Sequence, residues 1–169
     1  MAREMRRIVT GHDTAGKSIV AIDGPSTSMG AYWLADSTPA DNAAAGDAAQ
    51  RVRGLEPPRG GSIFRYAVIP PEDPNVTREE RERITARMFE QMGAAHCRPD
   101  TSRHPGMHKT RTVDYVILLS GEVTLLLDKG EVDLKPFDVV VQRGTNHAWV
   151  NKGKEPALIA AVLVDAKET

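Results

Sequence analysis

The C-terminal part of the chain is a series of short apolar segments separated by turn residues. The segments are Tyr115 to Leu119, Val123 to Leu127, Val132 to Leu134, Val139 to Val141, His147 to Val150 and Ala157 to Val164. Glycine, proline, asparagine or aspartate stands between neighbouring segments. Segments this short, bounded by such residues, are typical of β-strands joined by tight turns. The pattern predicts an all-β sandwich or barrel.

The N-terminal part adds further strands. Two apolar runs in residues 7–22, separated by Gly11 to Gly16, predict a hairpin or two edge strands. Short strands are also predicted at Tyr32 to Leu34 and at Ser62 to Ile69, and Pro70-Pro71 ends the second of them. Residues 37–50 are rich in Ala, Asp, Asn and Gly, which favours a surface loop or a short frayed helix.

One segment predicts a helix. Glu80 follows Thr77 by three residues, which is a capping box, and Gly93 supplies a stop. An apolar stripe at helical spacing consists of Ile84, Met88 and Met92. We expect this stripe to contact the core of the protein, with the helix against the outside or one mouth of a sheet.

Length and charge limit the number of domains and the kind of partner. A chain of 169 residues suits one domain with a sizeable core. The 22 basic and 23 acidic residues give a net charge of −1 without a long run of one sign, which argues against nucleic acid and favours a small molecule. The basic N-terminus lacks a following apolar core, and Ala157 to Val164 is too short to span a bilayer.

These features predict a cytoplasmic protein with no membrane partner. The single cysteine, Cys97, cannot form an internal disulfide, which agrees with a reducing compartment. We interpret Cys97 as an inert, small apolar residue rather than as a catalytic thiol.

Two polar clusters interrupt the strand pattern. Alternate residues of a strand share one face, so the first cluster consists of His108, Thr110, Thr112 and Asp114 on a single strand. The second consists of His147, Trp149 and Asn151. If the two clusters face each other inside a barrel, they form a site.

Both clusters carry a resemblance to a known family. His108, Thr110, Asp114 and then Gly121 resemble the first motif of the cupin family, and Asp138, a short apolar strand, Gly144, His147 and Asn151 resemble the second. The resemblance implies a double-stranded β-helix (jelly-roll) barrel in a single domain over residues 1–169. Residues 1–95 would supply N-terminal strands, a loop and one short helix, and residues 96–165 the conserved barrel core. It also implies a homodimer paired through the N-terminal strands.

The resemblance implies a metal site as well. Cupins commonly bind a divalent metal through three histidines and one glutamate, which makes His108 and His147 ligands here. Thr110 replaces a histidine and Asp114 replaces the glutamate, so the implied set is His108, Asp114 and His147, a two-histidine, one-carboxylate face. Iron, zinc, nickel and manganese stay open, and we expect no organic cofactor. The alternative is a metal-free pair of hydrogen-bonded imidazoles, with Asp114 at the surface.

Further residues complete the candidate site. His104 follows the same spacing, but Pro105-Gly106 interrupts the strand, so His104 is a substitute ligand, a general base or a plain loop residue. We expect Trp149 to shape an apolar pocket wall and Thr110 to orient substrate. Arg65 and Tyr66 are candidates for binding a carboxylate or phenolate, although an outward Arg65 is the commoner case.

The favoured function is a small-molecule lyase acting in the barrel interior, by dehydration, decarboxylation or a related proton transfer on a carbonyl substrate. Buried His and Asp side chains suit general acid–base catalysis, with His104, His108, Asp114 and His147 as the catalytic candidates. A bound metal would polarise the carbonyl. The alternatives are a non-haem iron dioxygenase and a metal-free cupin that binds a ligand without catalysis.

Overall fold

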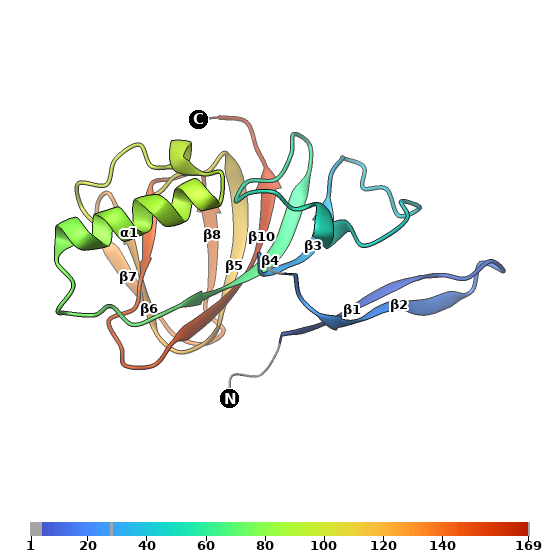
Figure 1. Ribbon diagram of the computed structural model, residues 1–169, viewed down its shortest axis with the longest axis horizontal. Helices are drawn as coiled ribbons and strands as arrows, with labels where there is room; N and C mark the ends of the chain where they lie inside the picture. The colour runs from blue at the N-terminus through green and yellow to red at the C-terminus, as the bar shows by residue number, and fades with distance from the viewer. Residues whose placement is uncertain (1–4, 28, 169) are drawn as a thin grey trace.

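A computed structural model describes residues 5–27 and 29–168, which form a barrel of two β-sheets, a projecting hairpin and one α-helix (Figure 1). The strands are β1 (Arg6–His12), β2 (Ser18–Pro25), β3 (Ala31–Ala35), β4 (Ser62–Ile69), β5 (Thr112–Ser120), β6 (Val123–Leu127), β7 (Glu131–Leu134), β8 (Val139–Arg143), β9 (His147–Val150) and β10 (Ala157–Asp165). The helix is α1 (Arg78–Gln91), and the 3₁₀ turns are η1 (Ala48–Arg51) and η2 (Ala95–Cys97).

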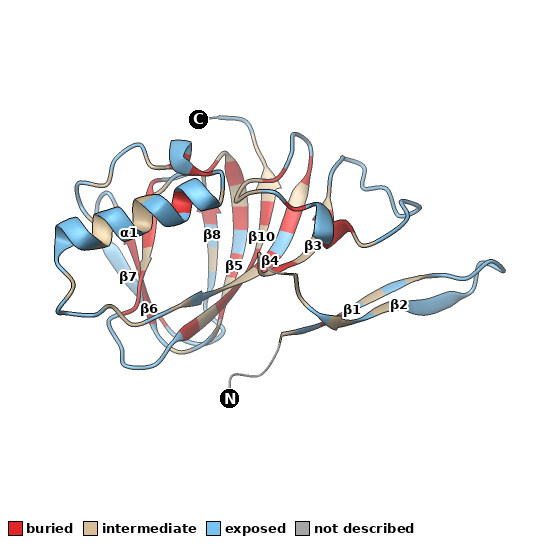
Figure 2. Ribbon diagram, viewed as in Figure 1, coloured by how far each residue is buried: buried red, intermediate tan, exposed pale blue. Residues whose placement is uncertain are grey.

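Two antiparallel sheets form the barrel. The larger has the strand order β3-β4-β10-β5-β8 and the smaller the order β7-β6-β9. Buried residues alternate with more exposed ones along β5, as expected of a strand with one face on a core (Figure 2). The inner faces share an apolar cluster of Val116, Leu118, Val123, Leu125, Leu134, Ala157, Ile159, Ala161 and Leu163. The predicted jelly-roll fold is confirmed.

The first polar cluster does not lie on a single strand, which corrects the sequence prediction. β5 begins at Thr112, so His108 and Thr110 precede it. Between His108 and β5 the backbone leaves the ladder, because the Lys109 N–H donates to the Cys97 carbonyl and the Arg111 N–H donates to Glu56. His108 instead makes an isolated antiparallel bridge to His147, the first residue of β9.

Helix α1 lies across one side of the barrel and begins as the sequence predicts (Figure 1). The Thr77 hydroxyl accepts a hydrogen bond from the Glu80 N–H at 3.2 Å. The predicted core stripe is wrong at two of its three positions, because Ile84 is 58% exposed and Met88 46% exposed. The buried residue is Phe89, which packs with Ala94, Cys97, Leu55 and Met92. The described helices include none with the length and apolarity to cross a membrane.

Strands β1 and β2 pair with each other and project from the barrel (Figure 1). Arg7 anchors the hairpin through its buried guanidinium, which forms an ion pair with Asp47 and donates to the Tyr32 carbonyl at 3.0 Å. A groove of about 1690 Å³ separates this hairpin from the outer face of the larger sheet, where Tyr115 is exposed. The predicted hairpin is therefore confirmed, and it stands apart from the sheets that build the barrel.

Candidate functional site

Two imidazoles, His108 and His147, lie against each other where β9 begins. The His108 N–H donates to the His147 carbonyl at 2.8 Å, and the His147 N–H donates to the His108 carbonyl at 2.9 Å. The ring centroids are 4.3 Å apart, with 46° between the ring planes. Residues that exchange both backbone hydrogen bonds point their side chains to the same face, so the pairing brings the two rings together.

The backbone fixes the tautomer of both rings in the same way. Nδ1 of His108 lies 2.9 Å from the Gly106 carbonyl, and Nδ1 of His147 lies 2.9 Å from the Thr145 carbonyl. A carbonyl oxygen only accepts, so each Nδ1 carries a proton and donates it. Each neutral ring then has an unprotonated Nε2, and the described residues supply no hydrogen bond to either one. Such a nitrogen can bind a metal or accept a proton.

Both rings are neutral at neutral pH. His147 is 2% exposed, and burial, aided by the neighbouring His108, lowers its pKa to about 3 against the opposing effect of the Thr145 carbonyl. Burial also lowers the pKa of His108, and the Arg98 cation adds to that effect. Because desolvation disfavours the imidazolium, the lone pairs on both Nε2 atoms stay available.

Asp114 is buried on the inner face of β5. Burial raises its pKa to about 6, the Thr112 hydroxyl acts in the opposite direction, and the Glu56 carboxylate adds to the rise. Its Oδ1 is buried, with no hydrogen-bond partner among residues 5–27 and 29–168. A buried acid with a pKa this close to neutrality exchanges its proton within the physiological range.

The predicted metal-binding trio is brought together only in part. The histidine pair fits a divalent metal, because both Nε2 lone pairs are free and both rings are fixed by carbonyls. His108, Asp114 and His147 are not among the groups, within the part of the chain described, whose three ligand atoms all lie within 4.8 Å of one another. Aspartate is one methylene shorter than the glutamate of the family pattern, which shortens its reach toward the rings.

Two aromatic side chains border the histidine pair. Trp149 meets His147 edge-on, with ring centroids 5.5 Å apart at 80°, so it lies beside the pair. The ring centroid of Phe89, from α1, lies 5.1 Å from that of His108, a contact that the sequence did not predict. The Thr110 hydroxyl is buried and shares a 2.7 Å hydrogen bond with the Thr112 hydroxyl.

The other predicted residues are held by partners of their own. His104 bonds Glu72 through Nε2 at 2.8 Å, and its Nδ1 accepts from the Gly106 N–H at 2.9 Å, so it positions the loop before His108. Arg65 is buried and donates to the carbonyls of Leu55 and Met29. Tyr66 lies 5.4 Å from the Tyr32 ring, and it is on the face of β4 opposite to that of Arg65.

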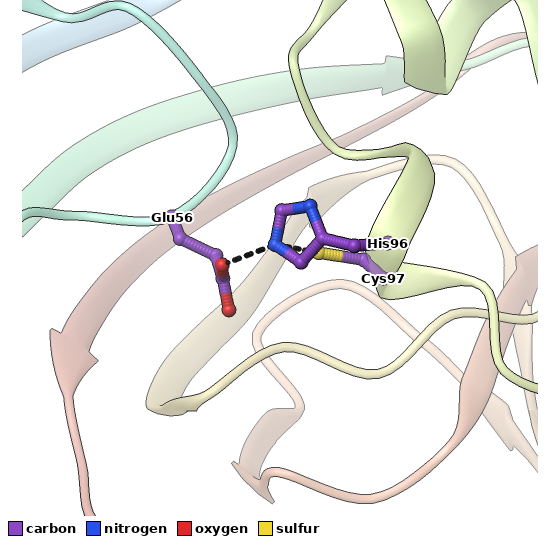
Figure 3. A group of neighbouring side chains, drawn as sticks. All are labelled: Glu56, His96 and Cys97. Atoms are coloured by element: carbon purple, nitrogen blue, oxygen red, sulfur yellow. Dashed lines mark hydrogen bonds and ion pairs between the residues drawn. The ribbon is translucent and has the colours of Figure 1, made fainter.

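A second cluster, which sequence reasoning missed, lies between a loop and η2 (Figure 3). Its members are Glu56, His96 and Cys97, and their ligand atoms all lie within 4.8 Å of one another. His96 and Cys97 are neighbours in the sequence, which was a visible signal. Glu56 lies forty positions before His96, and only the fold brings it there.

A comparison with known protein families matches one part of the chain. Residues 96–164 match the family model described as a cupin domain, a range that contains both histidines of the pair. This part of the chain is a cupin domain. His108 belongs to the first cupin motif and His147 to the second. Thr110 stands where the first motif usually has its second histidine.

The curated relatives that match parts of this chain include fungal proteins. Phomopsin biosynthesis cluster protein D of Diaporthe leptostromiformis is 55% identical over 47 residues, which are 27% of this chain and 25% of the relative. Oryzines biosynthesis cluster protein J of Aspergillus oryzae is 44% identical over 70 residues, which are 38% of this chain and 39% of the relative. The cupin-domain-containing oxidoreductase srdD of Neurospora crassa is 42% identical over 66 residues, which are 37% of this chain and 34% of the relative. This chain thus spans a quarter to two fifths of each relative's length.

Among solved structures, a cupin 2 conserved barrel domain protein from Salinispora arenicola aligns with a TM-score of 0.39 at 16% identity. The alignment covers 62% of this chain and 64% of that one.

Proposed function

We propose that this cupin domain is a small-molecule lyase that moves a proton on a carbonyl-containing substrate. The observation that carries the proposal is the pair of neutral imidazoles, His108 and His147, whose Nε2 atoms are both free of hydrogen bonds to the described residues. The same barrel holds Asp114, whose pKa is raised to about 6. Proton transfer requires one group that accepts a proton and another that donates one at the same pH.

Each side chain has a distinct role in this proposal. The Nε2 of His108 accepts the substrate proton, because its Nδ1 already donates to the Gly106 carbonyl. Asp114 holds a proton near pH 6 and lies two residues beyond Thr112, whose hydroxyl is hydrogen-bonded to that of Thr110. Trp149 forms an apolar wall beside His147. A divalent metal held by the two Nε2 atoms would supply Lewis-acid polarisation of the carbonyl.

Solvent-deuterium exchange tests the proposal without a known substrate. A panel of small 2-oxo and 3-hydroxy acids is incubated in D₂O with the protein, and NMR follows exchange at the carbon next to the carbonyl. We expect exchange or elimination with at least one compound. Asp114→Asn and His108→Gln should each slow it by about a hundredfold or more, in line with the usual contribution of general acid–base groups.

The control for this experiment is His12→Gln, because His12 is an exposed histidine on the hairpin. It should leave the exchange rate unchanged. Exchange that persists unchanged in both barrel variants, or that is absent across the panel, would rule out the proposed lyase activity.

A non-haem iron oxidoreductase is the second candidate, because three of the curated relatives are named cupin-domain-containing oxidoreductases. Two histidines and a carboxylate are the donor set of many non-haem iron oxygenases. Iron-loaded protein that consumes dioxygen in the presence of one of the panel compounds, and does so without prior deuterium exchange, would favour this reaction over the lyase. Retention of a compound with neither exchange nor oxygen consumption would favour a binding function.

We also propose a homodimer formed through the hairpin and the outer face of the larger sheet. Ile8, Ile19 and Val20 are exposed on the hairpin, and Tyr115 and Val141 on the sheet. Exposed apolar groups of this kind are typical of association surfaces. Sedimentation analysis should give a dimer for the parent and a monomer for Tyr115→Arg. A monomeric parent would exclude this arrangement.

A further inference from the structure

The cluster of Glu56, His96 and Cys97 joins two segments at one point (Figure 3). The His96 Nε2 lies 2.8 Å from Glu56 Oε2 and 3.5 Å from Cys97 Sγ. The carboxylate comes from the loop that precedes β4, and the other two groups come from η2. One ring nitrogen is therefore in contact with both an acid and a sulfur.

Hydrogen bonding cannot satisfy all three groups together. If Nε2 carries a proton, it donates to the carboxylate and has no lone pair for the thiol. If Nε2 lacks a proton, it can accept from the thiol but has nothing to donate to Glu56. A cation placed among the three atoms is bound by all of them, because each atom offers it a lone pair.

The backbone holds this cluster in place before any ligand arrives. The Arg111 N–H donates to Glu56 Oε1 at 2.6 Å, which leaves Oε2 facing His96. The Cys97 carbonyl accepts from the Lys109 N–H, also at 2.6 Å. The neighbouring Leu55 packs against both the barrel core and Phe89, so the loop is fixed on the side away from the cluster.

We propose that Glu56, His96 and Cys97 form a second metal site, which takes a thiophilic divalent cation such as Zn²⁺. Zinc bonds of about 2.0 to 2.3 Å give tetrahedral ligand-to-ligand edges of about 3.3 to 3.6 Å. The nitrogen-to-sulfur distance of 3.5 Å already fits such an edge, and the nitrogen-to-oxygen distance of 2.8 Å has only to lengthen by about half an ångström. The fourth position is left for water or another ligand.

The charges of the cluster suit a dication. Burial, with the Glu56 carboxylate adding to it, raises the pKa of the Cys97 thiol to about 12, while the Arg111 cation opposes the rise. Without metal the sulfur is therefore a protonated thiol. On binding, the S–H bond breaks, its proton leaves to solvent and a metal–sulfur bond forms. One thiolate and one carboxylate then neutralise the two positive charges.

The proposed site is open to solvent on one side. The His96 side chain is 66% exposed, whereas Cys97 is buried, so a cation enters past the imidazole. Once bound, the cation ties the Glu56 loop to η2, the turn whose Cys97 packs against Phe89. This role is independent of the chemistry proposed for the barrel.

Cobalt titration tests the site. Protein stripped with a chelator is titrated with Co²⁺, and a thiolate-to-cobalt charge-transfer band is followed in the near ultraviolet. We expect the band to reach a plateau within two equivalents, because the barrel site also takes up metal, and to disappear on addition of Zn²⁺. Cys97→Ser should abolish the band, and because the chain has a single cysteine, its source is unambiguous. His96→Gln and Glu56→Gln should each raise the Co²⁺ concentration needed by about tenfold or more.

Two controls separate this site from the barrel and from misfolding. His147→Gln should retain the full band, and His12→Gln should titrate as the parent does. His96 is exposed, so His96→Gln tests the site even if the Cys97 variant does not fold, as judged by circular dichroism. A folded parent without the band, or a band unaffected by both His96→Gln and Glu56→Gln, would overturn the proposal.

Discussion

His147 and His96 differ in burial and in the contacts of their Nε2 atoms. His147 is buried, its Nδ1 donates to a backbone carbonyl, and its Nε2 meets no polar group among the described residues. His96 is largely exposed, and one atom of its ring, Nε2, contacts both the Glu56 carboxylate and the Cys97 thiol. The first ring is fixed by the backbone of the turn just before its own strand, whereas the second depends on a distant loop. Burial therefore controls proton binding at the first site, and side-chain convergence controls ligand binding at the second.

The largest expected effect is a loss of unfolding free energy at acidic pH, caused by the buried His147. The pKa of His147 is about 3 in the folded protein against an ordinary 6.5, so the unfolded chain takes up the proton first as pH falls below 6.5. Stability from this group is complete above pH 6.5 and is lost toward pH 3. Between pH 7 and pH 4, the metal-free parent should lose about 3 kcal/mol more unfolding free energy than His147→Gln. Denaturant unfolding at both pH values measures the difference, and equal losses would contradict the assigned burial effect. His12→Gln, at an exposed position of the hairpin, is the matched control and should follow the parent.

Asp114 should give an effect of opposite sign. Its pKa is about 6 in the folded protein and 3.8 ordinarily, so ionisation costs stability as pH rises from 4 to 7. Asp114→Asn removes that cost, and over this range it should gain about 2 kcal/mol relative to the parent in denaturant unfolding. Asp41→Asn, at an exposed position, is the matched control and should show no such gain. A parent and an Asp114→Asn variant with parallel pH profiles would show that Asp114 is not buried as an acid.

Counting metal equivalents sharpens the contrast between the sites. Chelator-stripped parent should take up two equivalents of Zn²⁺, one for each site. His147→Gln should keep the equivalent at Glu56, His96 and Cys97, and Cys97→Ser should keep the barrel equivalent. In each case the affinity of the disrupted site should fall by about tenfold or more. Elemental analysis after gel filtration makes the count, and uptake lost at both sites in either variant would mean that the two are not separate.

The smallest effect concerns the coupling of the barrel to its surroundings. The Arg98 cation lowers the pKa of His108, lies 5.6 Å from the centre of the Phe89 ring and donates to Glu82. Arg98→Gln should raise the pKa of His108, which NMR titration of the imidazole protons would follow. The pKa of His147 should change less, since Arg98 is not among the groups that shift it. A lowered His108 pKa in the variant would contradict the role given to Arg98.

The parts of this molecule that local sequence determines were predictable. The Thr77 cap and the six C-terminal strand segments depend on residues within a few positions of one another. The motif spacing placed His108 and His147 in one site because strand pairing translates spacing into contact. Burial on α1 was not predictable from its apolar stripe, since the helix packs through Phe89 and leaves Ile84 exposed.

The second cluster marks the limit of sequence reasoning. Nothing near Glu56 in the sequence indicates that its carboxylate meets His96, because the contact results from how the loop packs on the barrel. Cys97 was interpreted as an inert apolar residue on its own, and its burial agrees with that interpretation. Its two neighbours in space, rather than any feature of the cysteine itself, are what give it candidate chemistry.

The reciprocal bridge between His108 and His147 also bears on how the protein folds. The bridge joins residues that β5 to β8 separate in the sequence, so forming it closes a long loop. Contacts of such long sequence separation carry a loop-closure cost and slow the folding reaction. We therefore expect the paired imidazoles to assemble late, close to the final cooperative step. Refolding monitored at these two rings would report the arrival of the native chain rather than the collapse that precedes it.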